Sequence, residues 1–201
     1  MSWRANLPSF PVGPLVERLT VLLHVLAVAI STMPGSRAQA AMADEIASAA
    51  SLGTLLTQAV NDGRELELRS VANHAELNRR IKADSCPGFA YKSYAITAGS
   101  QRFLYVVASK GRDMIIGRHW RIPLNGNKAD LARLTSSTVS CLNLGTPAAN
   151  ALRVAVTHLG PFPNEFHVLQ SNLHGIAVYV ATDSGMYVVE SGRIEAVETG
   201  D

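Results

Sequence analysis

The spacing of hydrophobic residues changes once along this 201-residue chain, near residue 89. Before that point, apolar residues recur at the spacing of one helix face, and the alanine-rich composition of residues 43–60 favours a helix. A second helix is predicted over His74–Ala83, with Asn73 as its N-cap and Glu76 completing a capping box. The part of the chain that precedes residue 89 is therefore predicted to fold as packing helices.

Beyond residue 89, apolar and polar residues alternate, and Tyr, Val, Ile and Trp become frequent, as is typical of β-strands. On the third strand, the alternation predicts one buried face and one exposed face that carries His119 and Arg121. The predicted strands are Ala90–Thr97, Arg102–Ser109, Asp113–Leu124, Leu152–Leu159, Glu165–Ser171, Gly175–Thr182, Met186–Glu190 and Arg193–Val197, with a short helical turn at Ala129–Leu134. This order predicts an α+β fold, in which N-terminal helices pack on a mainly antiparallel β-sheet.

The first forty residues have the pattern of a cleavable secretory signal peptide. Arg4 and Arg18 precede a short apolar run at residues 21–30, and the small residues of Ala38-Gln39-Ala40 follow. Cleavage is expected between Ala40 and Ala41, and a start of translation at Met33 or Met42 is the alternative. Because the apolar run is only about half as long as a bilayer span, no stable membrane span is expected after cleavage.

Residues 41–201 are accordingly predicted to form a single α+β domain, helical over 43–84 and strand-rich over 89–198, in the periplasm or outside the cell. The formal net charge of +2 excludes strong electrostatic capture of nucleic acid by the chain as a whole. The signal segment carries three arginines and one glutamate, a surplus equal to that +2, so the mature chain is formally neutral. Its charges are still divided, because basic residues gather in the first strands and acidic residues in the last.

The two cysteines are the most specific chemical signal in the mature chain. In an exported protein, a single pair such as Cys86 and Cys141 usually forms one disulfide. A reactive thiol paired with a histidine, or two free buried cysteines, are the alternatives.

The histidines do not have the spacing of a metal site or a known catalytic motif. No two lie four residues apart on a predicted helix, and no His-Glu-x-x-His motif occurs, so no metal is expected. No glycine-rich phosphate loop or dinucleotide fingerprint occurs either, so no cofactor is expected. Strand parity predicts that His158 is buried and that His167 is exposed. Asp183-Ser184-Gly185 fits a hairpin turn better than a nucleophile loop.

Aromatic and basic residues on the first strands form a candidate binding surface. The residue types are those that dominate protein interfaces, although strand alternation requires about half of the aromatic side chains to be core. The candidate binding residues are Tyr94, Arg102, Arg118, His119, Trp120 and Arg121.

These observations predict an exported protein without a recognisable catalytic motif that acts by binding, in the manner of an inhibitor or an immunity protein. Its partner would be a protein or an anionic component of the cell envelope. The alternative is an envelope hydrolase with a site around His158, His167 and Asp183. The two differ in whether those three groups meet beside a cleft.

Overall fold

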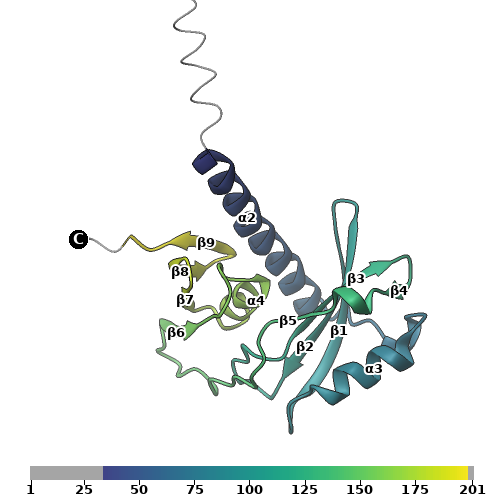
Figure 1. Cartoon of the computed structure of the whole chain (residues 1–201). Coiled ribbons are helices and arrows are strands. Elements are labelled where there is room, and N and C mark those ends of the chain that lie inside the picture. The colour runs from purple at the N-terminus through teal and green to yellow at the C-terminus, as the bar shows by residue number, and fades with distance from the viewer. Residues whose placement is uncertain (1–33, 199–201) are drawn as a thin grey trace, which may run out of the picture. The chain divides into compact units, whose positions relative to one another are not determined.

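A computed structural model describes residues 34–198 of the chain (Figure 1). The chain divides into two units, Met1–Ala43 and Asp44–Asp201, and the architecture below is that of the second. Residues 1–33 of the predicted export signal lie outside the described residues. The predicted cleavage residues Ala40 and Ala41 lie in the first described helix, α2, and are exposed.

Three α-helices and two short 3₁₀ turns are described within residues 34–198. The helices are α2 (Pro34–Asn61), α3 (His74–Ala83) and α4 (Glu165–His174), and the 3₁₀ turns are η1 (Leu68–Ser70) and η2 (Leu131–Arg133). The bounds of α3 match the predicted helix, and η2 confirms the predicted helical turn. Among these helices, none is both long and apolar enough to cross a bilayer.

The strands form two sheets. The first sheet is antiparallel and contains β1 (Ala90–Ala98), β2 (Gln101–Ser109), β3 (Trp120–Asn125), β4 (Lys128–Ala129) and β5 (Thr135–Ser136). The second contains β6 (Arg153–Thr157), β7 (Ala177–Thr182), β8 (Gly185–Glu190) and β9 (Arg193–Ala196). In it β6 pairs with β7 in parallel, whereas the other neighbours are antiparallel. The α+β class is confirmed, but the strands form two sheets instead of one. The parallel pair β6 and β7 is possible because α4 connects the two strands as a crossover helix.

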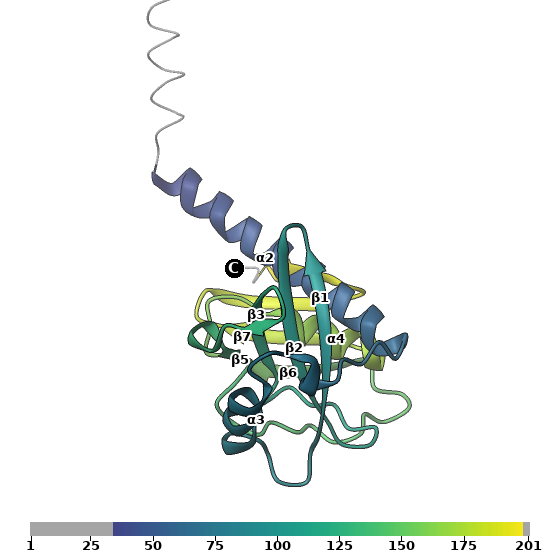
Figure 2. The same ribbon diagram turned by 90° about the vertical axis from the view of Figure 1, so that its right-hand side faces the viewer.

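Helix α4 lies between the two sheets (Figure 2). Its Phe166 and Leu169 pack with Tyr105 of β2 and with apolar residues of α2. Its Val168 packs on the other side, against Val178 and its neighbours in the second sheet. The opposite face of the first sheet is covered by α3, through Leu77 and Ile81. Both faces of the first sheet are therefore buried.

The predicted strand over Asp113–Leu124 is wrong in its first half, since β3 begins only at Trp120. Residues 113–119 form a buried loop whose backbone binds the segment 142–145, and Ile116 N–H donates to Leu142 O at 3.0 Å. Arg118 has a positive φ of 59°, which ends the extended conformation before β3. Because protein covers this loop on both sides, Ile115 and His119 are buried although parity predicted an exposed face.

The predicted strand over Glu165–Ser171 is α4. Asn164 caps the helix, because its Oδ1 accepts a hydrogen bond from Phe166 N–H at 3.1 Å, and the imidazole of His167 accepts from Asn164 N–H. Gly175, with a φ of 64°, supplies the left-handed C-cap. The capping box predicted for α3 is absent from that helix, because the side chain of Asn73 binds the backbone of Ala129 instead.

The predicted disulfide is confirmed: Cys86 and Cys141 are bonded and lie 55 residues apart in the sequence. The bond joins the end of α3 to the segment that holds the buried loop at residues 113–119. Closing a loop of this length stabilises the fold by about 4 kcal/mol in the chain-entropy model.

Gly53 permits the close approach of α2 to α4. A Cβ atom at this position would lie 2.4 Å from Val168 Cβ and 2.7 Å from Glu165 O. These contacts are shorter than van der Waals separation, and the second atom belongs to backbone, so the two helices would have to move apart.

We expect Gly53→Ala to lower the free energy of unfolding by about 1–3 kcal/mol, because overpacking outweighs the better helix propensity of alanine. Urea denaturation followed by circular dichroism measures this loss. Ser51→Ala, at an exposed position two residues away on the same helix, is the control and leaves the midpoint nearly unchanged. A Gly53→Ala variant as stable as the parent protein would show that α2 and α4 are not packed this tightly.

Candidate functional site

The candidate binding surface predicted on the first strands is not formed as one surface. Tyr94, His119 and Trp120 are core residues, with exposed fractions of 4%, 0% and 1%. The guanidinium of Arg118 is half-buried and lies 3.8 Å from Asp84. Arg102 is exposed at the start of β2, and Arg121 of β3 lines a cleft that is described below. Of the six predicted residues, only Arg121 lines this cleft, so the structure does not bring the predicted set together.

His119 has a structural role. Its Nδ1 accepts a hydrogen bond from Ala108 N–H at 3.0 Å, and its Nε2–H donates to Ile115 O at 2.7 Å. The ring also stacks on Phe166, with 4.9 Å between the ring centroids. Burial lowers the pKa of His119 to about 4, so the imidazole is neutral near pH 7. Both ring nitrogens are satisfied, so none is left to act on a ligand.

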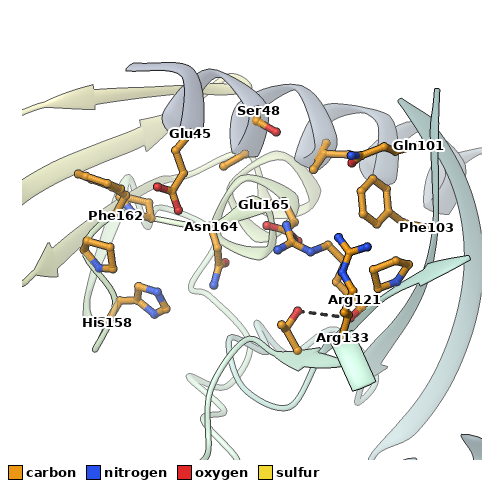
Figure 3. A pocket seen from close by; sticks show the side chains of 16 residues that line it. Glu45, Ser48, Gln101, Phe103, Arg121, Arg133, His158, Phe162, Asn164 and Glu165 are labelled. Atoms are coloured by element: carbon orange, nitrogen blue, oxygen red, sulfur yellow. Dashed lines mark hydrogen bonds and ion pairs between the residues drawn. The ribbon is translucent and has the colours of Figure 1, made fainter. Parts of the chain in front are cut away.

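A cleft of about 620 Å³ opens between α2, the edge of the first sheet and the segment that leads into α4 (Figure 3). We call it the polar cleft. Its lining comes from α2 (Glu45, Ser48, Ala49, Leu52), from the first sheet and the residues before β5 (Gln101, Phe103, Arg121, Pro123, Arg133, Thr135), and from the entry to α4 (His158, Pro161, Phe162, Pro163, Asn164, Glu165).

The floor of the polar cleft contains a buried ion pair. Arg121 Nη1 lies 3.0 Å from Glu165 Oε1, and the carboxyl side chain is only 4% exposed, against 35% for the arginine. The guanidinium carbon of Arg121 also lies 5.8 Å from the ring centroid of Phe103. A carboxylate this deeply buried requires a compensating charge, and Arg121 supplies it. The charge of Arg121 is thus neutralised within the protein by Glu165.

The hydroxyl of Tyr105 is buried near this pair. Within residues 34–198, it has no hydrogen-bond partner that meets normal geometry. Burial, and next the charge of Glu165, raise the pKa of Tyr105, so the phenol remains protonated. Tyr105 therefore adds a neutral polar group to the floor without changing its charge.

Arg133 is the cation that the cleft leaves uncompensated. In the described part of the chain, its guanidinium forms no ion pair with any carboxylate. The carboxylate of Glu45, across the cleft, likewise forms no ion pair with any described cation. Figure 3 shows Arg121 and Arg133 on one side of the hollow and Glu45 and His158 on the other. Phe103, Phe162 and the cleft prolines form the apolar parts of the wall. The cleft therefore combines one positive charge (Arg133) and one negative charge (Glu45) that form no ion pair within residues 34–198, together with apolar surface and neutral polar groups.

The three groups of the hydrolase alternative meet only in part. The rings of His158 and His167 are 5.0 Å apart, edge to face, and His158 lines the cleft, half-buried. His167 is buried, contrary to the prediction, because α4 turns it toward the core. Asp183 is exposed, and no hydrogen bond or ion pair within residues 34–198 joins it to either imidazole.

The ionisation of these histidines also argues against proton transfer. His167 Nδ1 accepts from Asn164 N–H at 3.1 Å, so the neutral ring has its proton on Nε2, for which the described residues offer no acceptor. Burial, and next the neighbouring His158, lower the pKa of His167 to about 3. Burial lowers the pKa of His158 as well, although Asp183 opposes that shift. Over the described ranges, no serine, threonine or cysteine side chain binds either ring, and no three potential metal ligands cluster.

Sequence reasoning missed most of the residues that form the cleft, among them Glu165, Arg133 and Asn164. The segment Gly160-Pro161-Phe162-Pro163-Asn164-Glu165 contained a usable signal, because prolines followed by Asn and an acidic residue are typical of a helix start. Nothing in the spacing of Arg121 and Arg133 indicated that they face α4, since the contact depends on how the sheet and the helix pack.

We expect Arg121→Gln to destabilise the fold more than Glu165→Gln. The first variant leaves a carboxylate buried without a countercharge and is expected to cost about 2–4 kcal/mol. The second leaves a cation that is already one-third exposed and is expected to cost about 1–2 kcal/mol. Urea unfolding at pH 7 measures both, and Arg102→Gln, at an exposed arginine, serves as the control with little change. The reverse order of the two losses would contradict the described ion pair.

The polar cleft thus has an unpaired guanidinium, apolar walls and a floor neutralised by an internal ion pair. This combination suits the binding of a ligand that has an anionic group and an apolar part. Searches of protein-family models, of curated proteins and of solved structures find no significant match to this chain, so the interpretation of its function rests on this geometry.

Proposed function

We propose that this protein is exported from the cytoplasm and acts by binding, with the polar cleft as its binding site. The observation that carries the proposal is Arg133, which forms no ion pair within residues 34–198 and lies at the wall of a hollow of about 620 Å³. Ligand sites in proteins are commonly hollows of about 300–1,000 Å³ with mostly apolar walls and a few polar groups. The cleft agrees with that description in size, and its lining is more polar, since nine of its 16 lining residues carry polar or charged side chains.

The lining indicates the chemistry of the ligand. Phe103 and Phe162 offer aromatic surface, and Arg133 offers a guanidinium that can form paired hydrogen bonds to a carboxylate or a phosphate. Arg121 is less available, because Glu165 already neutralises it. A ligand with an apolar part and one anionic group therefore suits the cleft better than a multiply charged one. A protein partner or an anionic envelope component, as an inhibitor- or immunity-type role requires, can present such a group.

Export is supported by two features. The pattern of residues 1–40 is that of a cleavable signal, and the bond between Cys86 and Cys141 is typical of proteins that fold in an oxidising compartment. In the proposed mature protein, the chain begins at Ala41, on the helix that supplies Glu45 and Ser48 to the cleft. The periplasm or the extracellular space is the compartment that fits both features.

The hydrolase alternative keeps one supporting observation, namely that His158 lines the cleft and lies beside His167. It is the weaker candidate, because a general base must be able to reach a proton on a nucleophile or a water, and the pKa of both rings is lowered by burial.

The binding proposal can be tested with N-acetyl-phenylalanine, a probe that has one aromatic group and one carboxylate. We expect it to shift the backbone amide signals of Thr135, Asn164 and Glu165 in two-dimensional NMR of the purified protein. N-acetyl-phenylalaninamide, which lacks the charge, is expected to bind about tenfold more weakly, because the contact to Arg133 is charge-assisted.

Two tryptophan variants provide the control. Ser48→Trp fills the cleft and is expected to abolish the shifts, whereas Ser51→Trp, also exposed on α2 but outside the lining, leaves them unchanged. Absent shifts, or shifts that persist in the Ser48→Trp variant, would contradict the assignment of this hollow as a binding site.

We expect the protein recovered from the periplasm of a bacterial host to begin at Ala41 and to gain the mass of two hydrogens on reduction. N-terminal sequencing and intact mass spectrometry with and without reductant measure both properties. A protein that stays in the cytoplasm and still begins at Met1 would contradict export. An unchanged mass after reduction would contradict the disulfide.

A further inference from the structure

A second hollow continues the polar cleft beyond His158. It has a volume of about 460 Å³, and its lining comes from the segment after β5 (Ser136, Ser137, Thr138, Val139, Ser140, Leu142) and from the end of β6 and the residues that follow (Thr157, His158, Leu159, Gly160). We call it the apolar groove. His158 lines both hollows. The cleft residue Thr135 directly precedes Ser136 of the groove, and the cleft residue Pro161 directly follows Gly160 of the groove. The two hollows are therefore neighbours that share His158, and we call the pair the joined depression.

The apolar groove displays hydrophobic side chains to solvent. Val139 is 78% exposed and Leu159 is 83% exposed, and both line the groove together with the half-buried Leu142. Single exposed apolar residues are common on proteins, but several around one hollow mark a surface that is covered by a partner. The groove therefore offers apolar surface that an apolar side chain of a ligand can cover.

Backbone N–H and C=O groups along β6 also point away from β7, the strand with which β6 pairs. Leu152 O accepts from Ala177 N–H at 3.1 Å, and His158 N–H donates to Ala181 O at 2.8 Å, so the even-numbered residues of this stretch face β7. The N–H and C=O groups of Ala155 and Thr157 consequently point away from β7. Of the strands within residues 34–198, only β7 pairs with β6, and only β3 pairs with β5. Strand edges of this kind bind extended peptides by backbone hydrogen bonds.

We propose that the occupant of the joined depression is an extended peptide segment of a partner protein. Its apolar side chains lie in the apolar groove between Val139 and Leu159, and a carboxylate at its other end pairs with Arg133 in the polar cleft. The direction follows from charge complementarity. Within residues 34–198, Arg133 forms no ion pair and lies across the cleft from Glu45, whereas the lining of the groove has no Lys, Arg, Asp or Glu. This inference rests on the proposed function of the polar cleft and specifies the class of its ligand.

The test uses random dodecapeptides displayed on phage and selected against the purified, oxidised protein. Enriched sequences are expected to share apolar residues followed or preceded by a carboxylate, and the best of them is synthesised with a fluorescent label. Its affinity for the parent protein and for each variant is measured by fluorescence anisotropy, with circular dichroism to show that every variant is folded.

Two groups of variants address the two ends. Arg133→Gln is expected to weaken the peptide at least about tenfold, and converting the peptide carboxylate to an amide is expected to give the same loss, with no further loss when both changes are combined. Leu159→Ser and Val139→Ser are each expected to weaken binding about fivefold or more. Leu152→Ser, at a leucine that is equally exposed but outside the groove, is the matched control and leaves the affinity unchanged.

Two modified peptides show whether the carboxylate that pairs with Arg133 is the C-terminus of the peptide or an acidic side chain. If amidation of the C-terminus removes the dependence on Arg133, the group is a chain end. If an Asp→Asn or Glu→Gln change removes it, the group is a side chain.

The outcomes separate this inference from the proposed function. One outcome is that N-acetyl-phenylalanine binds in the cleft while the affinity of the selected peptides is unchanged by Leu159→Ser and Val139→Ser. That result would overturn the peptide assignment and leave the binding function intact. Displacement of N-acetyl-phenylalanine by an acidic polysaccharide such as polygalacturonate, with no peptide enriched, would overturn it in favour of a polysaccharide ligand. Failure of both the small probe and the peptides would contradict both proposals.

Discussion

The burial of α4 between two sheets is the constraint on which the rest of the domain depends. Residues Glu165–Ser171 are all buried, so each polar side chain of this helix must find its partner inside the protein. The pairings are Glu165 with Arg121, His167 with Asn164 N–H, Gln170 with Ile115 N–H, and Ser171 with the backbone of Ile176 and Val189. These bonds tie the helix to the first sheet, to its own cap, to the buried loop and to the second sheet. The entry to α4 thereby becomes a rigid wall, and the polar cleft is the space left beside it.

This arrangement separates two arginines that look equivalent in the sequence. Arg121 faces the buried Glu165 and stabilises the fold, whereas Arg133 has no such partner in the described chain and faces the cleft. A charge that is neutralised inside the protein contributes little to ligand binding, and one that is not can form charge-assisted hydrogen bonds to an anion. The tertiary structure therefore assigns Arg121 to stability, and the proposed function uses Arg133 for recognition.

Local signals were enough for a substantial part of the fold. Helix α3, the hairpin of β1 and β2 and the meander of β7, β8 and β9 were predicted close to their observed bounds, because hydrophobic spacing and turn residues act within a few positions. Helix α4 was predicted as a strand for a physical reason. Because Glu165–Ser171 are all buried and mix polar with apolar side chains, α4 has no separate polar face and lacks the period from which helices are recognised. At residues 113–119 the alternation was present but misleading, because coverage on both sides buries residues of both parities, among them Ile115, Ile116 and His119.

The sequence by itself determined the α+β class, the pairing of Cys86 with Cys141 and the division of the chain into an early helical and a later strand-rich part. These properties depend on composition, on a count of cysteines and on the order of local elements. Only the tertiary structure decided that Tyr94, His119 and Trp120 are core, and that Arg133, Asn164 and Glu165 meet at one cleft. Burial and proximity between distant residues depend on which faces of the sheets and helices pack together, and a single sequence does not contain that information in its local pattern.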